Sequence, residues 1–247
     1  MQYGLIGWPL GHSFSKMYFT EKFIREGISD ARYELYPISE IQELPDLLSR
    51  VPDLRGLNVT IPYKQSVIPF LDQLDKSAEA VGAVNCIKIS SNRKLTGYNT
   101  DVIGFEKSLH DFTGKLPDVK YAFILGTGGA AKAVAYVLQK QNIPFHFISR
   151  NPKKEDEKFY SFLTHWRESS TLLINCTPLG TYPDTQEMPP VPLEILHAGN
   201  LVFDLVYNPA ETLLLQHARA RGCHVQNGLD MLHHQAEAAW NIWQTES

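Results

Sequence analysis

A short stretch in the first quarter of the chain carries side chains that are well suited to chemistry. In Gly-Leu-Asn-Val-Thr-Ile-Pro-Tyr-Lys, Asn58 and Thr60 alternate with apolar residues, and Lys64 follows two positions after Pro62. Alternation places Asn58 and Thr60 on one face of a strand, and a proline ends strand pairing. We therefore expect these two side chains to face a ligand that the lysine ammonium also reaches.

Further small polar residues stand near the ends of other predicted strands, where open α/β sheets bind ligands. They are Ser13, Ser15, Asn85 and Asp101. Serine hydroxyls can bind a carboxylate, asparagine amides can bind ring hydroxyls, and a Lys64–Asp101 pair can manage the proton that accompanies hydride transfer. Each residue also has a structural explanation, such as a helix cap or a turn, so the interpretation depends on their joint occurrence.

A glycine-rich loop between an apolar strand and a helix predicts a dinucleotide site. The segment Gly126-Thr127-Gly128-Gly129-Ala130-Ala131 has the form G-x-G-x-x-A. One glycine permits the tight turn and the next lets the pyrophosphate approach the backbone. The small last residue lets the helix pack on the strand, with the helix N-terminus facing the phosphates.

The end of the next strand favours NADP over NAD. An NAD site usually has an acid at this position, but here Ser149 and Arg150 stand there, with Lys153 and Lys154 close behind. A guanidinium can bind a 2′-phosphate through two hydrogen bonds, whereas a carboxylate would repel it. Acidic residues follow at once, so an exposed charged turn before a helix stays an alternative.

Apolar runs alternate with helical periodicity along nearly the whole chain, which predicts an α/β fold in two domains with a boundary near residue 102. Both domains are expected to have mainly parallel sheets, with one hairpin in the first. The expected strands are 3–7, 32–38, 54–61, 83–90, 94–98, 121–126, 144–149, 172–175, 201–206 and 224–226. The expected helices are 13–25, 40–49, 77–81, 102–112, 129–141, 156–167, 209–221 (with Pro209 in its first turn) and 230–243, and 114–120 is expected to be a linker.

Composition excludes several classes of partner. The 247 residues carry a net charge of −4, which gives no basic surface for nucleic acid. The sequence shows no signal peptide and no apolar run of about 18 residues that could cross a membrane. Three cysteines without C-x-x-C spacing predict reduced thiols in a cytoplasmic protein. The histidines lack the spacing of zinc ligands, so no metal is expected. The chain is expected to be a monomer or a homodimer.

Taken in order, the motifs of the chain resemble those of the shikimate dehydrogenase family. The similar segments are GWPLGHSFS, GLNVTIPYK, AEAVGAVN, GYNTDVIG, LGTGGAAKA, NCTPLG, DLVYNPAETLLL and GLDMLHHQA. The resemblance runs through the whole chain. It implies the NADPH-dependent, reversible reduction of 3-dehydroshikimate to shikimate, a step of chorismate and aromatic amino-acid biosynthesis.

The resemblance also implies a role for each matching residue, with Lys64 and Asp101 as the catalytic pair. The implied substrate-binding residues are Ser13, Ser15, Asn58, Thr60, Lys64, Asn85, Asp101, Tyr207 and Gln235. The implied cofactor-binding residues are Gly126, Thr127, Gly128, Gly129, Ala130, Ser149, Arg150, Lys154, Thr177 and Gly228. Because Gln235 lies on the last helix, that helix is expected to return to the first domain. The expected domains are then a substrate domain over 1–102 plus 229–247 and a Rossmann-like NADP-binding domain over 103–228.

Some positions depart from the family pattern, and several alternatives stay open. Lys16 replaces a proline, Cys86 and Thr181 replace a threonine and a methionine, and Ser149 and Asn151 flank Arg150 in place of other residues. The alternatives are a quinate/shikimate dehydrogenase that uses NAD and a catalytically silent, ligand-sensing module. The intact catalytic pair argues against the silent module. A tetrahydrofolate-linked dehydrogenase is disfavoured by the paired serines and the Asn-Thr-Asp segment.

Overall fold

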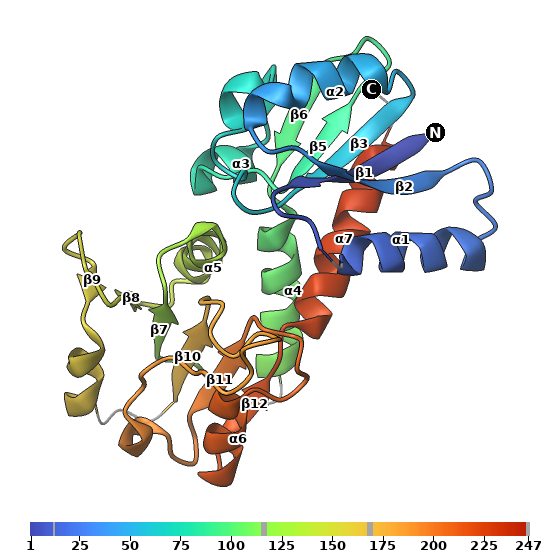
Figure 1. Cartoon of the computed structure of the whole chain (residues 1–247). Coiled ribbons are helices and arrows are strands. Elements are labelled where there is room, and N and C mark those ends of the chain that lie inside the picture. Colours follow the sequence, from blue (N-terminus) through green and yellow to red (C-terminus); the bar gives the residue numbers. More distant parts are fainter. Residues whose placement is uncertain (12, 115–117, 167–169, 246–247) are drawn as a thin grey trace. The chain divides into compact units, whose positions relative to one another are not determined.

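Two six-stranded sheets organise the chain, one in each of two units (Figure 1). The computed structural model describes residues 1–11, 13–114, 118–166 and 170–245. The first unit comprises Met1–Thr100 and Ala236–Ser247, and the second comprises Asp101–Gln235. The last helix, α7 (Leu229–Gln244), therefore contributes residues to both units.

The first sheet has the strand order β2-β1-β3-β5-β6-β4. Its strands are β1 (Gln2–Gly7), β2 (Arg32–Pro37), β3 (Leu54–Val59), β4 (Gln73–Leu74), β5 (Cys86–Ile89) and β6 (Leu95–Tyr98). β1 is parallel to both β2 and β3, so the carboxyl ends of these three strands lie at one edge. β5 and β6 form the predicted antiparallel hairpin, which joins the sheet through β3.

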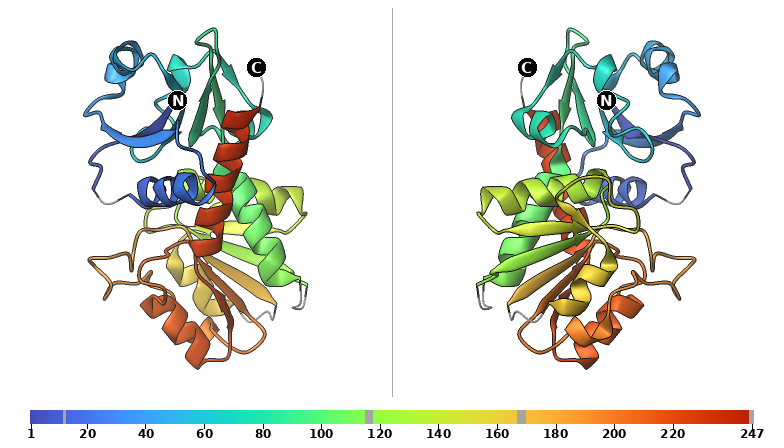
Figure 2. Two further views of the ribbon diagram at one scale, coloured as in Figure 1. Left: turned by 90° about the vertical axis from the view of Figure 1, so that its right-hand side faces the viewer. Right: turned by 90° about the vertical axis from the view of Figure 1, so that its left-hand side faces the viewer.

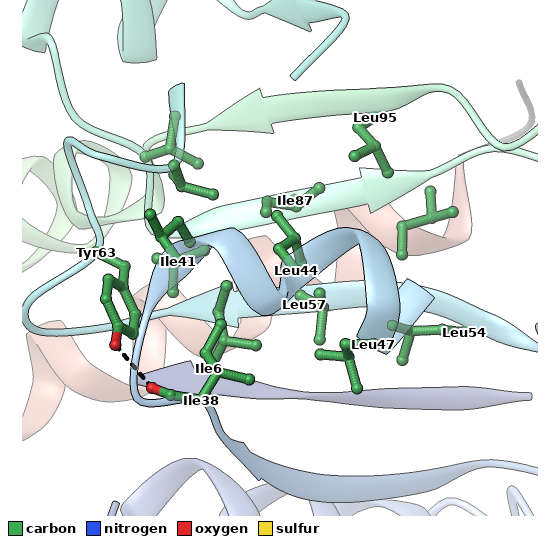
Figure 3. Close-up of a cluster of buried hydrophobic side chains, with 14 of the residues drawn as sticks. Ile6, Ile38, Ile41, Leu44, Leu47, Leu54, Leu57, Tyr63, Ile87 and Leu95 are labelled. Carbon is green, nitrogen blue, oxygen red and sulfur yellow. Dashed lines mark hydrogen bonds between the residues drawn. The ribbon is translucent and has the colours of Figure 1, made fainter. Parts of the chain in front are cut away.

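Short helices cover one face of this sheet. The helices on this face are η1 (Ile41–Glu43), α2 (Leu44–Arg50), η2 (Ile68–Phe70) and α3 (Lys76–Val81), whereas α1 (Phe14–Arg25) packs on the opposite face. Figure 3 shows α2 lying over the sheet, with Leu44 and Leu47 directed toward Leu57. In the same cluster the buried Tyr63 hydroxyl donates to the backbone oxygen of Ile38 at 2.7 Å. This bond anchors the turn that follows β3.

An aromatic cluster covers the opposite face and brings the end of the chain into the first unit. Tyr3, Phe19 and Trp243 belong to it. The indole Nε1 of Trp243 donates to the backbone oxygen of Ile87 at 3.0 Å. A Cβ atom on Gly56 would lie 2.3 Å from that same nitrogen, so only glycine lets Trp243 approach β3. The second half of α7 is thus part of the core of the first unit.

The second sheet is parallel throughout and has the order β12-β11-β10-β7-β8-β9 (Figure 2). Its strands are β7 (Tyr121–Leu125), β8 (Phe145–Ile148), β9 (Glu157–Lys158), β10 (Thr171–Asn175), β11 (Leu201–Asp204) and β12 (His224–Gln226). From β7 the chain adds β8 and β9 on one side, and then returns to add β10, β11 and β12 on the other side. This is the doubly wound order of dinucleotide-binding sheets, and its direction of winding reverses between β7 and β10.

The helices of the second unit are α4 (Thr100–Thr113), α5 (Gly129–Lys140), η3 (Tyr160–His165), η4 (Leu193–Ile195) and α6 (Leu213–Ala220), together with the first half of α7. α4 and α7 pack closely in this unit. A Cβ atom on Gly104 would lie 2.6 Å from the backbone oxygen of Met231. None of the helices in the described ranges has the length and apolar content that a bilayer-spanning segment requires.

The prediction of a helix over 156–167 is wrong. Glu157 and Lys158 instead form β9, and a 3₁₀ helix follows from Tyr160. The backbone oxygen of Asp156 accepts from the N–H of Phe147 in β8 at 3.1 Å, and that of Lys158 accepts from the N–H of Ser149, just after β8, at 2.9 Å. Because these carbonyls extend the edge of the sheet, they are not available for helical bonds. Residue 167 and residues 115–117 of the predicted linker lie outside the described residues.

Two other predicted boundaries are corrected. The helix predicted over 209–221 begins only at Leu213, because the Thr212 side chain caps it by accepting from the backbone N–H of Leu215 at 3.4 Å. Pro209 is therefore not in its first turn. The strand predicted to reach Ile61 ends at Val59, so Thr60 begins the turn and Pro62 does not terminate the ladder.

Candidate functional site

Two asparagines meet at the carboxyl end of β3. The side-chain Nδ2 of Asn58 donates to the backbone oxygen of Asn85 at 3.2 Å, and the backbone N–H of Val59 donates to the same oxygen at 2.9 Å. The Oδ1 atom of Asn85 accepts from the backbone N–H and the hydroxyl of Thr100, at 2.6 and 3.1 Å. These bonds set the orientation of both amide groups. The two bonds from Thr100 also fix the position of that residue, which directly precedes Asp101.

The turn after β3 positions Lys64 beside the same segment. Thr60 packs against Gly7 at the end of β1, where a Cβ atom would lie 2.5 Å from the Thr60 methyl. The backbone N–H of Tyr63 donates to the oxygen of Thr60 at 2.9 Å, and the backbone oxygen of Lys64 accepts from Val84 at 2.7 Å. The backbone of Lys64 is therefore hydrogen-bonded to Val84, the residue next to Asn85.

The two serines lie at the start of α1 and have different partners. Ser13 is the N-cap and accepts from the backbone N–H of Lys16 at 3.4 Å, while it also lines an open cavity of about 390 Å³. Ser15 is near Tyr33 of β2, where it partly opposes the rise that burial causes in the pKa of the phenol. Lys16, where the family pattern has proline, forms an ion pair with Glu34 at 2.6 Å. Ser13 therefore caps α1, and the predicted binding of a substrate carboxylate would be a second role of the same side chain.

Three further predicted residues belong to the second unit. Asp101 lies in the first turn of α4, after Thr100, where the helix dipole favours a carboxylate. Gln235 is buried on α7, and its Nε2 donates to the backbone oxygen of Leu232 at 2.9 Å. Tyr207 follows β11, and partial burial raises the pKa of its phenol. Their substrate roles stay predictions.

The glycine loop lies where the winding of the second sheet reverses, at the carboxyl ends of β7 and β10. Gly126 has φ +99°, a conformation that L side chains rarely adopt. A Cβ atom there would lie 3.2 Å from the methyl of Thr177. The structure therefore brings together Gly126 and Thr177, two residues predicted to bind the cofactor. Ligands of doubly wound sheets bind at this crevice.

The start of α5 fits a pyrophosphate. Its N-cap is Gly128, so no side chain caps it, and no acidic residue stands in its first turn. A Cβ atom on Gly128 would meet no atom within 4 Å among the described residues. Uncapped N–H groups of a first turn, next to open space and without a competing carboxylate, favour an anion. Thr127, Gly129 and Ala130 complete this predicted loop.

The buried side chain of Asn175 holds Thr177 in place through two hydrogen bonds. The Oδ1 of Asn175 accepts from the backbone N–H and the hydroxyl of Thr177, at 3.0 and 2.7 Å. The Nδ2 of Asn175 donates to Asp204 at 2.9 Å. Asp204 also accepts from the Val206 N–H at 3.0 Å and the Thr212 hydroxyl at 2.6 Å. Burial raises the pKa of this carboxyl to about 6.

The residues after β8 present their polar groups at the surface. The Ser149 hydroxyl accepts from the backbone N–H of Asn151 at 3.2 Å, and Arg150 and Lys154 are exposed. Burial raises the pKa of Tyr160 to about 12, and the nearby charge of Arg150 partly opposes that rise. The guanidinium is therefore close enough to Tyr160 to act on its phenol electrostatically.

Gly228 has a steric reason to be glycine. A Cβ atom there would lie 2.1 Å from the backbone oxygen of Leu205, and its own N–H donates to the backbone oxygen of Val206 at 3.2 Å. The chain entering α7 thus passes directly over the end of β11. The cofactor contact predicted for Gly228 stays a prediction.

The three cysteines are not suited to nucleophilic chemistry. Burial raises the pKa of the thiols of Cys86, Cys176 and Cys223 above the ordinary value, and the Asp204 carboxylate raises that of Cys176 further. Since the thiolate is the reactive form, protonated thiols act as packing groups here.

Reasoning from the sequence did not assign three residues that support this site: Tyr33, Asn175 and Asp204. Asn175 and Asp204 begin the segments NCTPLG and DLVYNPAETLLL, so their motifs could have pointed to them. Tyr33 stands in an ordinary strand sequence and gave no such signal. Its contacts arise only because β2 and β3 flank the same central strand.

Comparison with known proteins gives consistent matches. The sequence profile of the shikimate dehydrogenase substrate binding domain matches residues 5–87. A shikimate dehydrogenase (NADP(+)) of Methanococcus maripaludis strain S2 is 38% identical over 255 residues, which cover 97% of this chain and 90% of that protein.

Solved structures match over the full length as well. A chorismate mutase/shikimate 5-dehydrogenase fusion protein from Clostridium acetobutylicum superposes with a TM-score of 0.88 at 38% identity, covering 100% of this chain and 92% of that one. Shikimate 5-dehydrogenase from Thermus thermophilus, in complex with NADP(H) and shikimate, gives 0.86 at 30% identity and covers 99% and 93%. The predicted two-domain α/β fold is therefore confirmed.

Proposed function

This chain belongs to the shikimate dehydrogenase family, and we propose on that premise that it reduces 3-dehydroshikimate reversibly to shikimate with NADPH. The reaction is a step of aromatic amino-acid biosynthesis. The observation that carries the proposal is the polar arrangement of the first unit. The side chain of Asn58 donates to the backbone oxygen of Asn85, and the backbone oxygen of Lys64 accepts from Val84, the residue before Asn85.

The first unit supplies most of the groups proposed to bind substrate. Ser13 and Ser15 bind the carboxylate with their hydroxyls at the start of α1. Asn58, Thr60 and Asn85 bind ring hydroxyls at the end of β3. From the second unit, Asp101 and Gln235 are assigned to hydroxyls and Tyr207 to the wall of the site. The fixed amides of Asn58 and Asn85 support this assignment, since oriented donors lose little freedom on binding.

NADP is the proposed cofactor, held by the second unit. The glycine loop and the start of α5 bind the pyrophosphate, Arg150 and Lys154 bind the 2′-phosphate, and Thr177 lies beside the loop. Ser149 stands where an NAD-binding site usually has an acid, which favours the 2′-phosphate. When bound, NADPH supplies the hydride that the C3 carbonyl of the substrate receives.

Lys64 and Asp101 are proposed to manage the proton. Lys64 donates or relays a proton to the oxygen that becomes the C3 hydroxyl, and its ammonium stabilises the negative charge that develops there. Asp101 orients the lysine and a substrate hydroxyl. It lies in the first turn of α4, where the helix N-terminus attracts negative charge.

Turnover by the purified protein tests this proposal most directly. Nicotinamide absorbance is followed with shikimate or quinate as substrate and NADP or NAD as cofactor. We expect shikimate with NADP to give the highest kcat/KM. Preference for quinate or NAD would indicate the broader quinate/shikimate dehydrogenase, and shikimate binding without turnover would indicate a silent module.

Substitution of Arg150 by alanine is expected to raise KM for NADPH about tenfold to a hundredfold, as one or two charge-assisted hydrogen bonds of about 1.5–3 kcal/mol are lost. KM for NADH should be nearly unchanged, because NADH has no 2′-phosphate. The matched control is Arg221→Ala, an exposed arginine after α6. Equal loss of affinity for both cofactors would contradict the role of Arg150.

A cytoplasmic location is part of the proposal. It is supported by three free cysteines, which are typical of a reducing compartment.

A further inference from the structure

One carboxylate on the second half of α7 joins that helix to α1 within the first unit (Figure 1). Both oxygens of Glu237 accept from Nζ of Lys22, each at 3.0 Å, and Oε1 also accepts from the hydroxyl of Tyr18. Lys22 donates in addition to Glu26, four residues further along α1, at 2.9 Å. The bonds to Glu237, and not the bond to Glu26, therefore connect α1 with α7.

The lysine in this contact is buried, which is rare for a charged side chain. Lys22 is 4% exposed, and its ammonium lies 5.9 Å from the centre of the Trp240 ring. Glu237 and Trp240 are three residues apart on α7, so one face of that helix supplies both the carboxylate and the ring. A buried charge that loses a partner is strongly destabilised, so Lys22 is confined to this place between the two helices.

The tyrosine in the contact acts as a donor. Burial raises the pKa of the Tyr18 phenol, and its hydrogen bond to Glu237 raises that pKa further. The phenol therefore keeps its hydrogen and gives it to the carboxylate.

The face of α1 that meets Glu237 also carries a residue that the proposed function assigns to the substrate carboxylate. Ser15, Tyr18 and Lys22 follow one another at three and four positions, which places them along one side of the helix. Ile24, on the other side, is 78% exposed. Ser13 caps the same helix. The position of α1 thus decides where both serine hydroxyls lie.

Aromatic packing alone does not fix the rotation of α1. Phe19 and Phe23 bury the helix against Tyr3, but apolar contact has no preferred direction. Hydrogen bonds do have preferred directions. Because Glu237 accepts from Tyr18 and from Lys22, one turn further along α1, its carboxylate sets both the rotation of the helix and its position along its own axis.

We propose that Glu237 is a positioning residue for binding of the substrate carboxylate, because it fixes α1 through Tyr18 and Lys22 and thereby places the hydroxyls of Ser13 and Ser15. The inference rests on the proposed function. The substrate carboxylate takes no part in hydride transfer, so it is bound equally in the ground state and the transition state. Loss of Glu237 should therefore weaken substrate binding and leave the chemical step unchanged.

Comparison of Glu237→Gln with Glu26→Gln is the central test. Each removes one carboxylate from the Lys22 ammonium, and the two side chains are similarly exposed, at 40% and 37%, but only Glu237 lies on α7. We expect Glu237→Gln to raise KM for shikimate about tenfold, the effect of one charge-assisted hydrogen bond, and Glu26→Gln to change it less than about twofold. In both variants kcat and KM for NADPH should stay close to those of the unaltered protein. An equal rise in the two variants would overturn the proposal, as would a fall in kcat without a rise in KM.

Tyr18→Phe gives a second test, which also serves if Glu237→Gln does not fold. This change keeps the ring and leaves Lys22 paired with both carboxylates. We expect KM for shikimate to rise about fivefold, the effect of one ordinary hydrogen bond. In a Glu237→Ala background the same change should have no effect, because the carboxylate through which Tyr18 acts is gone. Equal effects in the two backgrounds would contradict the role of Glu237.

Ser15→Ala separates this role from an effect on Gln235, which stands two residues before Glu237. In the Ser15→Ala background Glu237→Gln should raise KM for shikimate much less than in the unaltered protein, since the hydroxyl that it positions is already absent. An undiminished rise would rule out positioning through α1. Absence of turnover in the unaltered protein would count against the proposed function instead. Calorimetric titration with shikimate would then compare the affinities of Glu237→Gln and Glu26→Gln and decide the inference directly.

Discussion

Replacement of Lys64 by alanine is expected to lower kcat for shikimate oxidation by about 10²–10⁴-fold, the usual contribution of a placed acid or base. KM for shikimate should change far less, because the ammonium acts on charge that develops in the transition state. The fold should persist, since the Lys64 backbone oxygen still accepts from Val84 and the Tyr63 hydroxyl still anchors the turn on Ile38.

Steady-state kinetics with both substrates at saturation check this prediction. Lys94→Ala is the matched control, because it removes an exposed lysine from the same unit, on the β5–β6 hairpin. A Lys64→Ala protein that keeps near-native kcat would disprove the catalytic role.

Lys64→Arg then separates the two roles of the lysine. An arginine keeps the positive charge but does not release its proton near neutrality. Recovery of most of kcat would identify charge stabilisation as the main contribution, whereas a loss like that of Lys64→Ala would identify proton transfer.

The second large effect is expected at Asp204. Asp204→Ala leaves three donors without their acceptor: the Asn175 amide, the Val206 N–H and the Thr212 hydroxyl. Each unsatisfied buried group costs about 1–3 kcal/mol, a large part of a typical total stability of about 5–15 kcal/mol. KM for NADPH should also rise, since Asn175 no longer holds Thr177. Urea unfolding and cofactor titration measure the two effects.

Asp204 should also make stability depend on pH in a defined direction. Burial raises its pKa from 3.8 to about 6, so between these values the folded state binds more protons than the unfolded state. The ionised carboxylate therefore lowers stability above pH 6, and stability is regained as the pH falls. From about pH 7.5 to about pH 4.5 the gain is about 2 kcal/mol.

Asp204→Asn should remove this gain. The free energy of unfolding of the unaltered protein, relative to the variant, should thus increase on acidification. Asp184→Asn, at an exposed position of the same unit, is the matched control. Parallel pH profiles for the unaltered protein and Asp204→Asn would contradict the assignment.

Much of the fold could be predicted because local pattern and tertiary structure agree. The apolar run 121–125 and the glycine loop after it predict β7 and α5, and the structure has both. Residues 156–167 show where agreement fails. Phe159, Leu163 and Trp166 have helical spacing, but the backbone before them pairs with β8. Pairing with a distant strand has no signature in the segment itself.

For the candidate site, residue types were predictable but partners were not. A strand ending in Asn-Val-Thr predicts polar ligands at a sheet edge, and the structure places Asn58 there. That the Asn58 amide lies between Tyr33 and the Asn85 backbone depends on three segments, β2, β3 and the residue before β5, which the pairing of the sheet brings together. Periodicity along one segment cannot supply such contacts, since they join residues 25 and 27 positions apart.

The path of the chain through the two units also constrains its synthesis. The first unit is interrupted after Thr100 and completed only by Ala236 and the residues that follow, whereas the second unit is continuous. On the ribosome, β1 to β6 emerge early but lack Trp240 and Trp243, which cover their aromatic face. Domains fold as units while the chain grows. The part of the protein made first is therefore the last to reach its final structure, and the inserted unit can fold ahead of it.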